Sequence, residues 1–133
     1  MSAFVDTNIL ICHLTGDPPG LATRATAYLE AADDLYLTDL VVAETVYVLE
    51  SFYEVQRTRV AGAIRSLLAL GSMIVVDRGL LLRAVEVYET ARLDFAEAHL
   101  VACAESTGIF RVASFDKTID RVGTVIRVEP IAE

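Results

Sequence analysis

The stretch Phe4-Val5-Asp6-Thr7-Asn8 predicts how an α/β fold begins in this chain. Residues 3–5 form a short apolar segment typical of a buried strand, and a helical spacing of apolar residues follows from residue 8 to residue 14. Asp6 stands at the junction, where open α/β sheets usually bind ligands. It has two interpretations, a simple helix cap or one member of a group of carboxylates. If Asp6 belongs to such a group, the other carboxylates must come from later in the sequence.

Length and composition predict one soluble-type domain over residues 1–133. Hydrophobic residues make up 54% of the chain and mean hydropathy is +0.48, yet no apolar run approaches the ~20 residues of a membrane helix. Some apolar surface is therefore expected to contact a partner or a second copy. The start lacks a basic region before its apolar residues, so we expect no signal peptide and no membrane association. Cys12 and Cys103 fit buried free thiols of a cytoplasmic protein.

The charge balance alone argues against binding to nucleic acid. The net charge is -8, from 19 acidic and 11 basic residues, whereas phosphate binding depends on basic surface. Ten of the eleven basic residues are arginine, the better phosphate ligand. Acids grouped around a metal ion also stop repelling phosphate once the cation is bound. The net charge therefore does not exclude a metal-dependent enzyme that acts on nucleic acid.

Strands and helices alternate nearly throughout the chain. The pattern predicts strands at 3–5, 35–37, 73–76, 112–114 and 124–128, and helices at 8–14, 21–32, 40–53, 59–70, 80–92 and 95–107, with a short turn at 119–122. Residues 77–79 are predicted as a turn. This alternation indicates a three-layer α/β/α fold with a mostly parallel central sheet of about four or five strands.

Five acids are candidates for one cleft: Asp6, Glu44, Asp94, Glu97 and Asp116. Strand ends and the helix starts that follow them share one edge of a parallel sheet, which could bring Asp6, Glu44 and Asp116 together. The helix around Glu44 is apolar nearly all round, so we expect this acid to be buried and to need a partner, a proton or a metal. Each acid also has a simpler interpretation. Asp94 and Glu97 resemble a capping box, and Asp116 resembles the start of a turn.

Other catalytic chemistry is poorly represented. His13 and His99 are isolated, no serine lies in a nucleophile-elbow context, and no glycine-rich phosphate loop is present. The carboxylates are the only concentrated polar chemistry in the sequence.

Four segments in order resemble the motifs of PIN domains, across the whole chain. Phe4-Val5-Asp6-Thr7-Asn8 is similar to the first motif and Ala43-Glu44 to the second. Asp94-Phe95-Ala96-Glu97-Ala98 resembles the third, and Ser114-Phe115-Asp116 resembles the fourth. The order and spacing are similar to the short VapC-type toxins. One departure is Glu97, because the family usually has Asp directly before this alanine. Either Asp94 or Glu97 could supply the ligand, since positions three apart share a helix face.

The resemblance implies a ribonuclease that depends on Mg²⁺ or Mn²⁺ and cleaves a structured cellular RNA. It implies that Asp6, Glu44 and Asp116, with Asp94 or Glu97, hold the metal, for which carboxylate oxygens are suited. Thr7, Asn8 and Ser114 would support these acids or contact the phosphate. Arg24, Lys117 and Arg121 are candidate contacts to the RNA backbone. The family further implies a cognate VapB-like antitoxin and a homodimer, or a higher assembly with the antitoxin.

Two other function classes remain open from the sequence. A PIN-like module could bind a partner or RNA without cleaving it, which the Glu97 departure and the net charge of -8 favour. A receiver-like phosphoacceptor would need adjacent acids after the first strand and an Asp after the third. Only Asp77 fits that pattern, because the first strand ends in the single acid Asp6.

Overall fold

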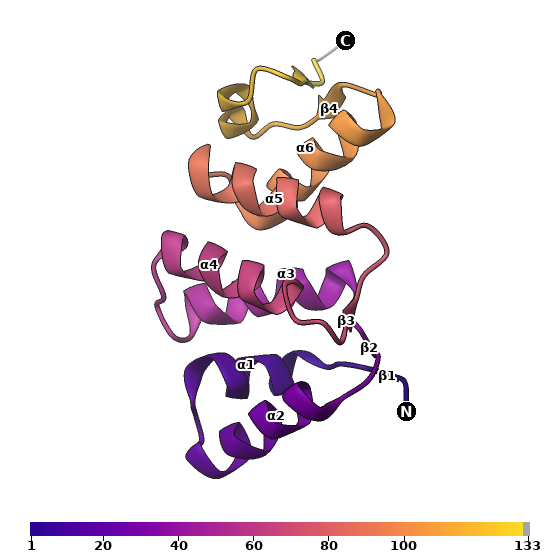
Figure 1. Ribbon diagram of the computed structural model, residues 1–133. Helices are drawn as coiled ribbons and strands as arrows, with labels where there is room; N and C mark the ends of the chain where they lie inside the picture. The colour runs from indigo at the N-terminus through magenta and orange to yellow at the C-terminus, as the bar shows by residue number, and fades with distance from the viewer. Residues whose placement is uncertain (132–133) are drawn as a thin grey trace. The chain divides into compact units, whose positions relative to one another are not determined.

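The structure is a computed structural model that describes residues 1–131. The chain divides into two compact units, which are described separately below. Unit 1 is Met1–Val76, drawn from indigo to magenta in Figure 1. Unit 2 begins at Asp77 and continues to the C-terminus, from pink to yellow.

Unit 1 is a small parallel sheet with four helices. Its strands β1 (Ala3–Phe4), β2 (Leu35–Tyr36) and β3 (Met73–Ile74) pair in the order β1-β2-β3, with Leu35 opposite both Ala3 and Met73. Helices α1 (Thr7–Thr15) and α2 (Pro19–Ala31) separate the first two strands, and α3 (Asp39–Ser51) and α4 (Arg57–Leu68) separate the next two. Parallel pairing requires such helical crossovers, because a tight hairpin can join only antiparallel strands.

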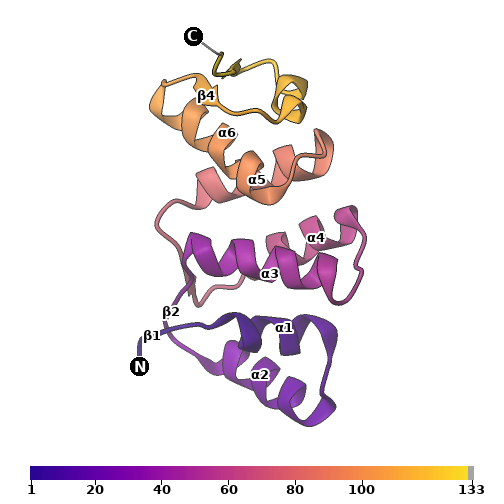
Figure 2. The same cartoon turned by 180° about the vertical axis from the view of Figure 1, so that it is seen from behind.

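The core of unit 1 lies among its four helices and against the sheet. Helix α1 packs on both α2 and α3, and α3 packs on α4 (Figures 1 and 2). Leu10, Leu29, Leu35, Val42 and Ile64 are at most 2% exposed. Burial of each such side chain contributes about 1.5–3 kcal/mol relative to leaving it in water.

Unit 2 is built on a pair of helices. Helices α5 (Arg78–Thr90) and α6 (Phe95–Thr107) pack closely, and strand β4 (Arg111–Ala113) follows α6. The short 3₁₀ helix η1 (Lys117–Arg121) leads to β5 (Ile126–Val128), which pairs with β4 in parallel. Gly108 ends α6 with φ +75°, a left-handed conformation that glycine adopts without steric cost.

The predicted α/β class with parallel strands is confirmed, and most element boundaries agree within a few residues. The strands contain only two or three residues, because capping residues start the next helix almost at once. The described strands pair as sets of three and two instead of one ladder of four or five. Residues 77–79 are not the turn predicted: Asp77 caps α5 by accepting a hydrogen bond from the backbone N–H of Leu80. Over residues 1–131, no helix combines the length and apolar character required to cross a membrane.

Candidate active site

Asp6 is the N-cap of α1 and lies just beyond β1. Its Oδ1 accepts a hydrogen bond of 2.8 Å from the backbone N–H of Thr7, while the residue as a whole remains exposed. Thr7 is the first residue of the helix and is buried. Its hydroxyl oxygen has no hydrogen-bond partner in the part of the chain described. The Asp6 carboxylate therefore caps α1 and remains accessible to solvent.

Glu44 is exposed, so the prediction that it is buried is wrong. Helix α3 buries one stripe, formed by Val42, Val46 and Leu49. Its other apolar residues include Leu40 at 77% exposure and Tyr47 at 67%. The helix presents apolar side chains to solvent, which is why its composition suggested burial all round. Glu44 lies four residues after Leu40 and three before Tyr47, and so shares their exposed face.

The sheet register places Asp6 and the start of α3 at the same edge of unit 1. Phe4 pairs with Tyr36, so Asp6 and Thr38 occupy equivalent positions two residues beyond their strands. Thr38 caps α3, its hydroxyl oxygen accepting a 3.2 Å hydrogen bond from the backbone N–H of Val41. Both helices therefore begin where β1 and β2 end, as predicted for strand-end residues of a parallel sheet.

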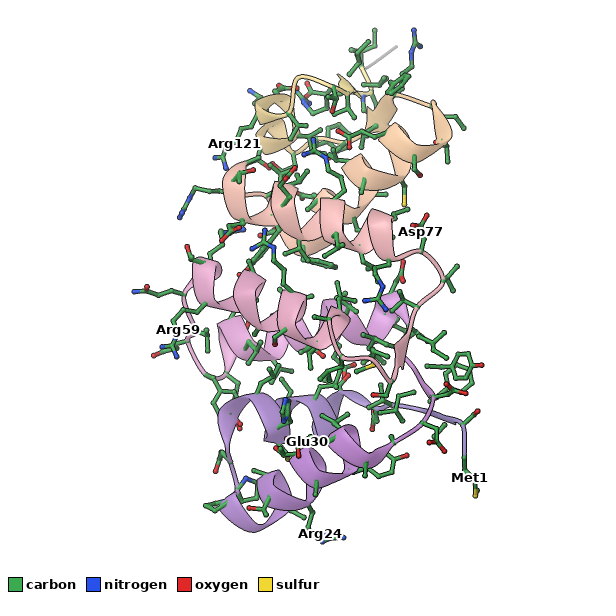
Figure 3. The ribbon with its side chains drawn as sticks, viewed as in Figure 1. Met1, Arg24, Glu30, Arg59, Asp77 and Arg121 are labelled. Atoms are coloured by element: carbon green, nitrogen blue, oxygen red, sulfur yellow. The ribbon has the colours of Figure 1, made fainter. Side chains whose placement is uncertain are left out.

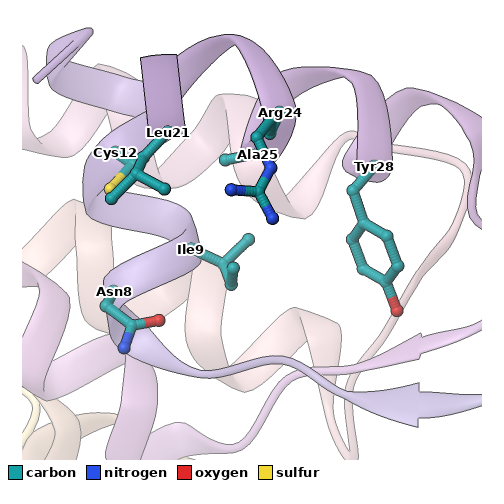
Figure 4. Close-up of a pocket in the computed structure, with 7 residues that line it drawn as sticks. All are labelled: Asn8, Ile9, Cys12, Leu21, Arg24, Ala25 and Tyr28. Carbon is teal, nitrogen blue, oxygen red and sulfur yellow. The ribbon is translucent and has the colours of Figure 1, made fainter. Parts of the chain in front are cut away.

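A cavity of about 520 Å³ lies between α1 and α2 and brings two predicted residues together. Asn8 and Arg24 both line it, with Ile9, Leu21 and Tyr28 supplying apolar walls. Figure 4 shows the Arg24 guanidinium and the Asn8 amide on this cavity. None of the described residues that line it is acidic, so Arg24 gives a positive site on a protein with a net charge of -8.

In unit 2, Asp94 and Glu97 open α6 without forming a capping box. Asp94 occupies the N-cap position, yet its side chain makes no capping hydrogen bond and the residue is exposed. Glu97 is half-buried, and its carboxylate accepts a hydrogen bond from Thr118 in η1. The capping interpretation therefore does not account for either acid.

Asp116 is held by a compact hydrogen-bonded loop after β4. Its backbone N–H donates to the Ser114 hydroxyl oxygen at 2.9 Å. Its Oδ1 accepts two bonds from Thr118, from the backbone N–H at 2.9 Å and from the hydroxyl at 2.8 Å. Arg127 in β5 donates to the carbonyl oxygen of Ser114 at 3.0 Å. Ser114 therefore supports the backbone of Asp116.

Glu97 and Asp116 lie close enough to affect each other's ionisation. Burial, followed by the hydrogen bond and charge of Asp116 and the charge of Asp94, raises the pKa of Glu97 to about 7. The pKa of Asp116 is lowered, first by the Thr118 backbone N–H and then by Glu97 and the Thr118 hydroxyl. Two like charges at short range oppose joint ionisation. Glu97 is the acid that lies beside Asp116. Asp94 also raises the pKa of Glu97, through its negative charge.

This pair predicts a distinct pH dependence of stability in metal-free buffer. Glu97 has an ordinary pKa of 4.5 and a folded-state pKa of about 7. The folded state therefore binds its proton more tightly, and the associated stability is lost as pH rises from about 5 to 8. The lowered pKa of Asp116 acts below pH 4 and lies outside this window. We expect the free energy of unfolding to fall between pH 5 and 8, and Glu97→Gln to remove that fall.

The measurement is urea denaturation in EDTA at several pH values. Glu105→Gln is the matched control on the same helix, because Arg83 lowers the pKa of Glu105. That variant should lose a constant amount of stability from pH 5 to 8. An unchanged pH slope in Glu97→Gln would show that Glu97 is not the group responsible.

The two remaining basic candidates differ in their surroundings. Lys117 is exposed at the start of η1. Arg121, labelled in Figure 3, donates to the carbonyl oxygens of Ala91 and Arg92 at 3.3 and 3.0 Å. Its guanidinium therefore ties η1 to the residues after α5, and only its remaining N–H groups are open to a ligand.

Thr118 was not among the predicted site residues, although its hydroxyl contacts both Asp116 and Glu97. The sequence signal was modest, a hydroxyl residue two positions after an acid, which is typical of an ordinary turn. Neither histidine joins these acids: His13 contacts the Thr26 hydroxyl, and His99 lies beside Cys103. Within residues 1–131, no three acidic, histidine or cysteine side chains form a metal-binding group.

Residues 3–125 match the PIN domain family. The chain belongs to that family. PIN domains are typically nucleases that use divalent metal ions, so membership indicates a hydrolase acting on nucleic acid. No curated protein matches the chain significantly. The membership agrees with the order of the four acidic segments, all of which fall within the matched residues.

The acids of this PIN domain fit a divalent cation by their chemistry. Carboxylate oxygens are the ligands preferred by Mg²⁺ and Mn²⁺. Burial, followed by the hydrogen bond and charge of Asp116, raises the pKa of Glu97 to about 7, and a bound cation would offset the repulsion between the two carboxylates. Asp6 and Glu44 are exposed, so their carboxylate oxygens are accessible to a ligand.

Proposed function

We propose that this PIN domain is an endoribonuclease that requires Mg²⁺ or Mn²⁺. The observation that carries the proposal is the Glu97–Asp116 pair, a set of hard oxygen donors in a chain of the PIN family. We assign Asp6, Glu44, Glu97 and Asp116 as the residues that would hold the metal, with Asp94 beside Glu97. When bound, a divalent cation lowers the pKa of water and stabilises charge on a phosphate.

The protein's own groups would orient the acids and the substrate. Ser114 and Thr118 fix Asp116 through three hydrogen bonds, so this carboxylate needs little reorganisation. Asp6 is held in place by the backbone N–H of Thr7. The hydroxyl of Thr7 is buried, whereas the exposed residue Asn8 is available to a phosphate.

We assign contacts with the RNA backbone to Arg24, Lys117 and Arg121. Arg24 is the best supported, because it lines a cavity together with Asn8 and the described residues of that cavity include no acid. A guanidinium can bind a phosphate through two parallel hydrogen bonds. Lys117 follows Asp116 directly and is exposed, so it can contact the same substrate as that acid. Arg121 would contribute through the N–H groups that its two carbonyl contacts leave open.

We further propose that the protein is a VapC-type toxin that cleaves a structured cellular RNA in the cytoplasm. A VapB-like antitoxin would inhibit it, and the toxin would form a homodimer or a larger assembly with that antitoxin. The exposed apolar side chains of unit 1, among them Leu40, Tyr47 and Phe52 at 67–77% exposure, are compatible with such partners. Surfaces of this kind on soluble proteins often mark protein contacts.

The function is tested by incubating the purified protein with total cellular RNA in Mg²⁺, in Mn²⁺ and in EDTA. We expect discrete fragments with either metal, none in EDTA, and recovery of cleavage when excess Mg²⁺ is added back. Sequencing the new RNA ends identifies the cleaved site. Equal cleavage with and without EDTA would contradict a metal-dependent nuclease and point to a contaminant.

The same experiment distinguishes a module that binds without cutting, which the glutamate at position 97 favours. That module would retain RNA in a mobility-shift assay and yield no fragments with any of the metals. Calorimetry with Mn²⁺ adds a second criterion, because a module without catalytic metal ligands should show no binding at millimolar concentration.

A further inference from the structure

Thr118 joins two acids that come from different elements of unit 2. It is the second residue of η1, and its hydroxyl lies 2.8 Å from Asp116 Oδ1 and 3.3 Å from Glu97 Oε2. Glu97 belongs to the first turn of α6, 21 residues earlier in the chain. Thr118 therefore connects the start of α6 to the loop that follows β4.

The hydroxyl is the adjustable part of this connection. A threonine hydroxyl has one proton to donate, so its contacts with the two carboxylates are alternatives for that proton. The backbone N–H of Thr118 already binds Asp116 Oδ1 at 2.9 Å. This backbone hydrogen bond therefore still holds Asp116 when the Thr118 hydroxyl donates its proton to Glu97. Threonine is also branched at Cβ, which restricts χ1 and keeps the hydroxyl between the two acids.

We propose that Thr118 is a positioning residue that holds the Glu97 and Asp116 carboxylates together for a divalent cation. The inference rests on the proposed function for the identity of the bound group, but it concerns affinity for the cation and not cleavage. Side chains that orient metal ligands commonly change metal affinity by about 10–100-fold when they are removed. Thr118 would act in this way on one ligand from each of two elements.

The Thr118 hydroxyl can be removed by substitution without removing the other hydrogen bonds that hold the loop after β4. The loop keeps its other supports when the hydroxyl is removed, namely the Thr118 N–H bond to Asp116, the Ser114 bond to the Asp116 N–H and the Arg127 bond to the Ser114 carbonyl. Thr118→Val keeps the size and branching of the side chain and deletes only the donor. Thr118→Ser keeps the donor and deletes a methyl group.

The test is Mn²⁺ binding to the full-length protein by isothermal titration calorimetry, without RNA. We expect Thr118→Val to weaken Mn²⁺ binding by about tenfold and Thr118→Ser to bind within about threefold of the unsubstituted protein. Thr124→Val is the matched control, because the Thr124 hydroxyl also donates to a glutamate of α6, Glu105. That variant should bind Mn²⁺ like the unsubstituted protein. Thermal unfolding in EDTA monitors the folding of each variant.

The outcomes separate this inference from the proposed function. Equal Mn²⁺ affinity of folded Thr118→Val and the unsubstituted protein would overturn the positioning role, and so would equal weakening in Thr124→Val. Failure of the unsubstituted protein to bind Mn²⁺ would overturn it as well. A protein that binds Mn²⁺ with the expected dependence on Thr118, yet cleaves no RNA, would refute the ribonuclease and leave this inference standing.

Discussion

Asp6→Asn is expected to lower the rate of RNA cleavage by at least about a hundredfold. Loss of groups that merely orient a metal ligand typically costs about 10–100-fold, and Asp6 is proposed to be a ligand itself. Asparagine caps helices about as well as aspartate, so the hydrogen bond to the Thr7 N–H should survive. The substitution removes the negative charge and preserves the start of α1. It therefore separates the chemical role of Asp6 from its structural one.

The measurement is the initial rate of RNA cleavage in Mg²⁺, with urea denaturation to compare stability. Asp77→Asn is the matched control: Asp77 caps α5 through its bond to the Leu80 N–H, and no catalytic role is assigned to it. That variant should cleave at the original rate. Asp6→Ala should lose the cap as well and be less stable by about 1 kcal/mol. Cleavage by Asp6→Asn at the original rate would remove Asp6 from the proposed metal site.

Tyr88→Ala is expected to destabilise the protein by about 3–5 kcal/mol, the range for large aromatic residues in a core. Tyr88 is 1% exposed in the last turn of α5, and its ring meets that of Phe95 edge-on with centroids 6.1 Å apart. Phe95 is the first residue of α6, between Asp94 and the turn that carries Glu97. The cavity would therefore loosen the helix start that presents both acids. Domains are stable by only about 5–15 kcal/mol, so the loss is a large fraction of the total.

Urea denaturation monitored by circular dichroism measures this effect. Leu82→Ala is the control on the same helix, because Leu82 is 40% exposed and should cost little. Comparable destabilisation by the two substitutions would contradict the assignment of Tyr88 to the core. Tyr88→Phe keeps the ring and its contact with Phe95, so we expect it to retain most of the stability that Tyr88→Ala loses.

The sequence predicted the parts of the site that depend on neighbouring residues. Asp6 and Asp116 follow strands, as the local pattern indicated, and each is the N-cap of the helix that comes next. Glu44 shows where such reasoning failed. Its apolar neighbours predicted burial, but α3 exposes Leu40 and Tyr47, and Glu44 with them. Composition gives the number of apolar residues on a helix, whereas exposure depends on which face another element covers.

The order of strands and helices and the PIN motifs follow from the sequence alone, because each depends on residues a few positions apart. It takes the folded structure to show that Glu97, and not Asp94, lies beside Asp116, and that the Thr118 hydroxyl contacts both Glu97 and Asp116. Asp94 and Glu97 are equivalent by spacing, since both lie at the start of one helix. A hydrogen bond from η1 to that helix joins Thr118 to Glu97 across 21 residues of sequence. Contacts over such separations are set by the packing of whole elements, which local sequence patterns do not encode.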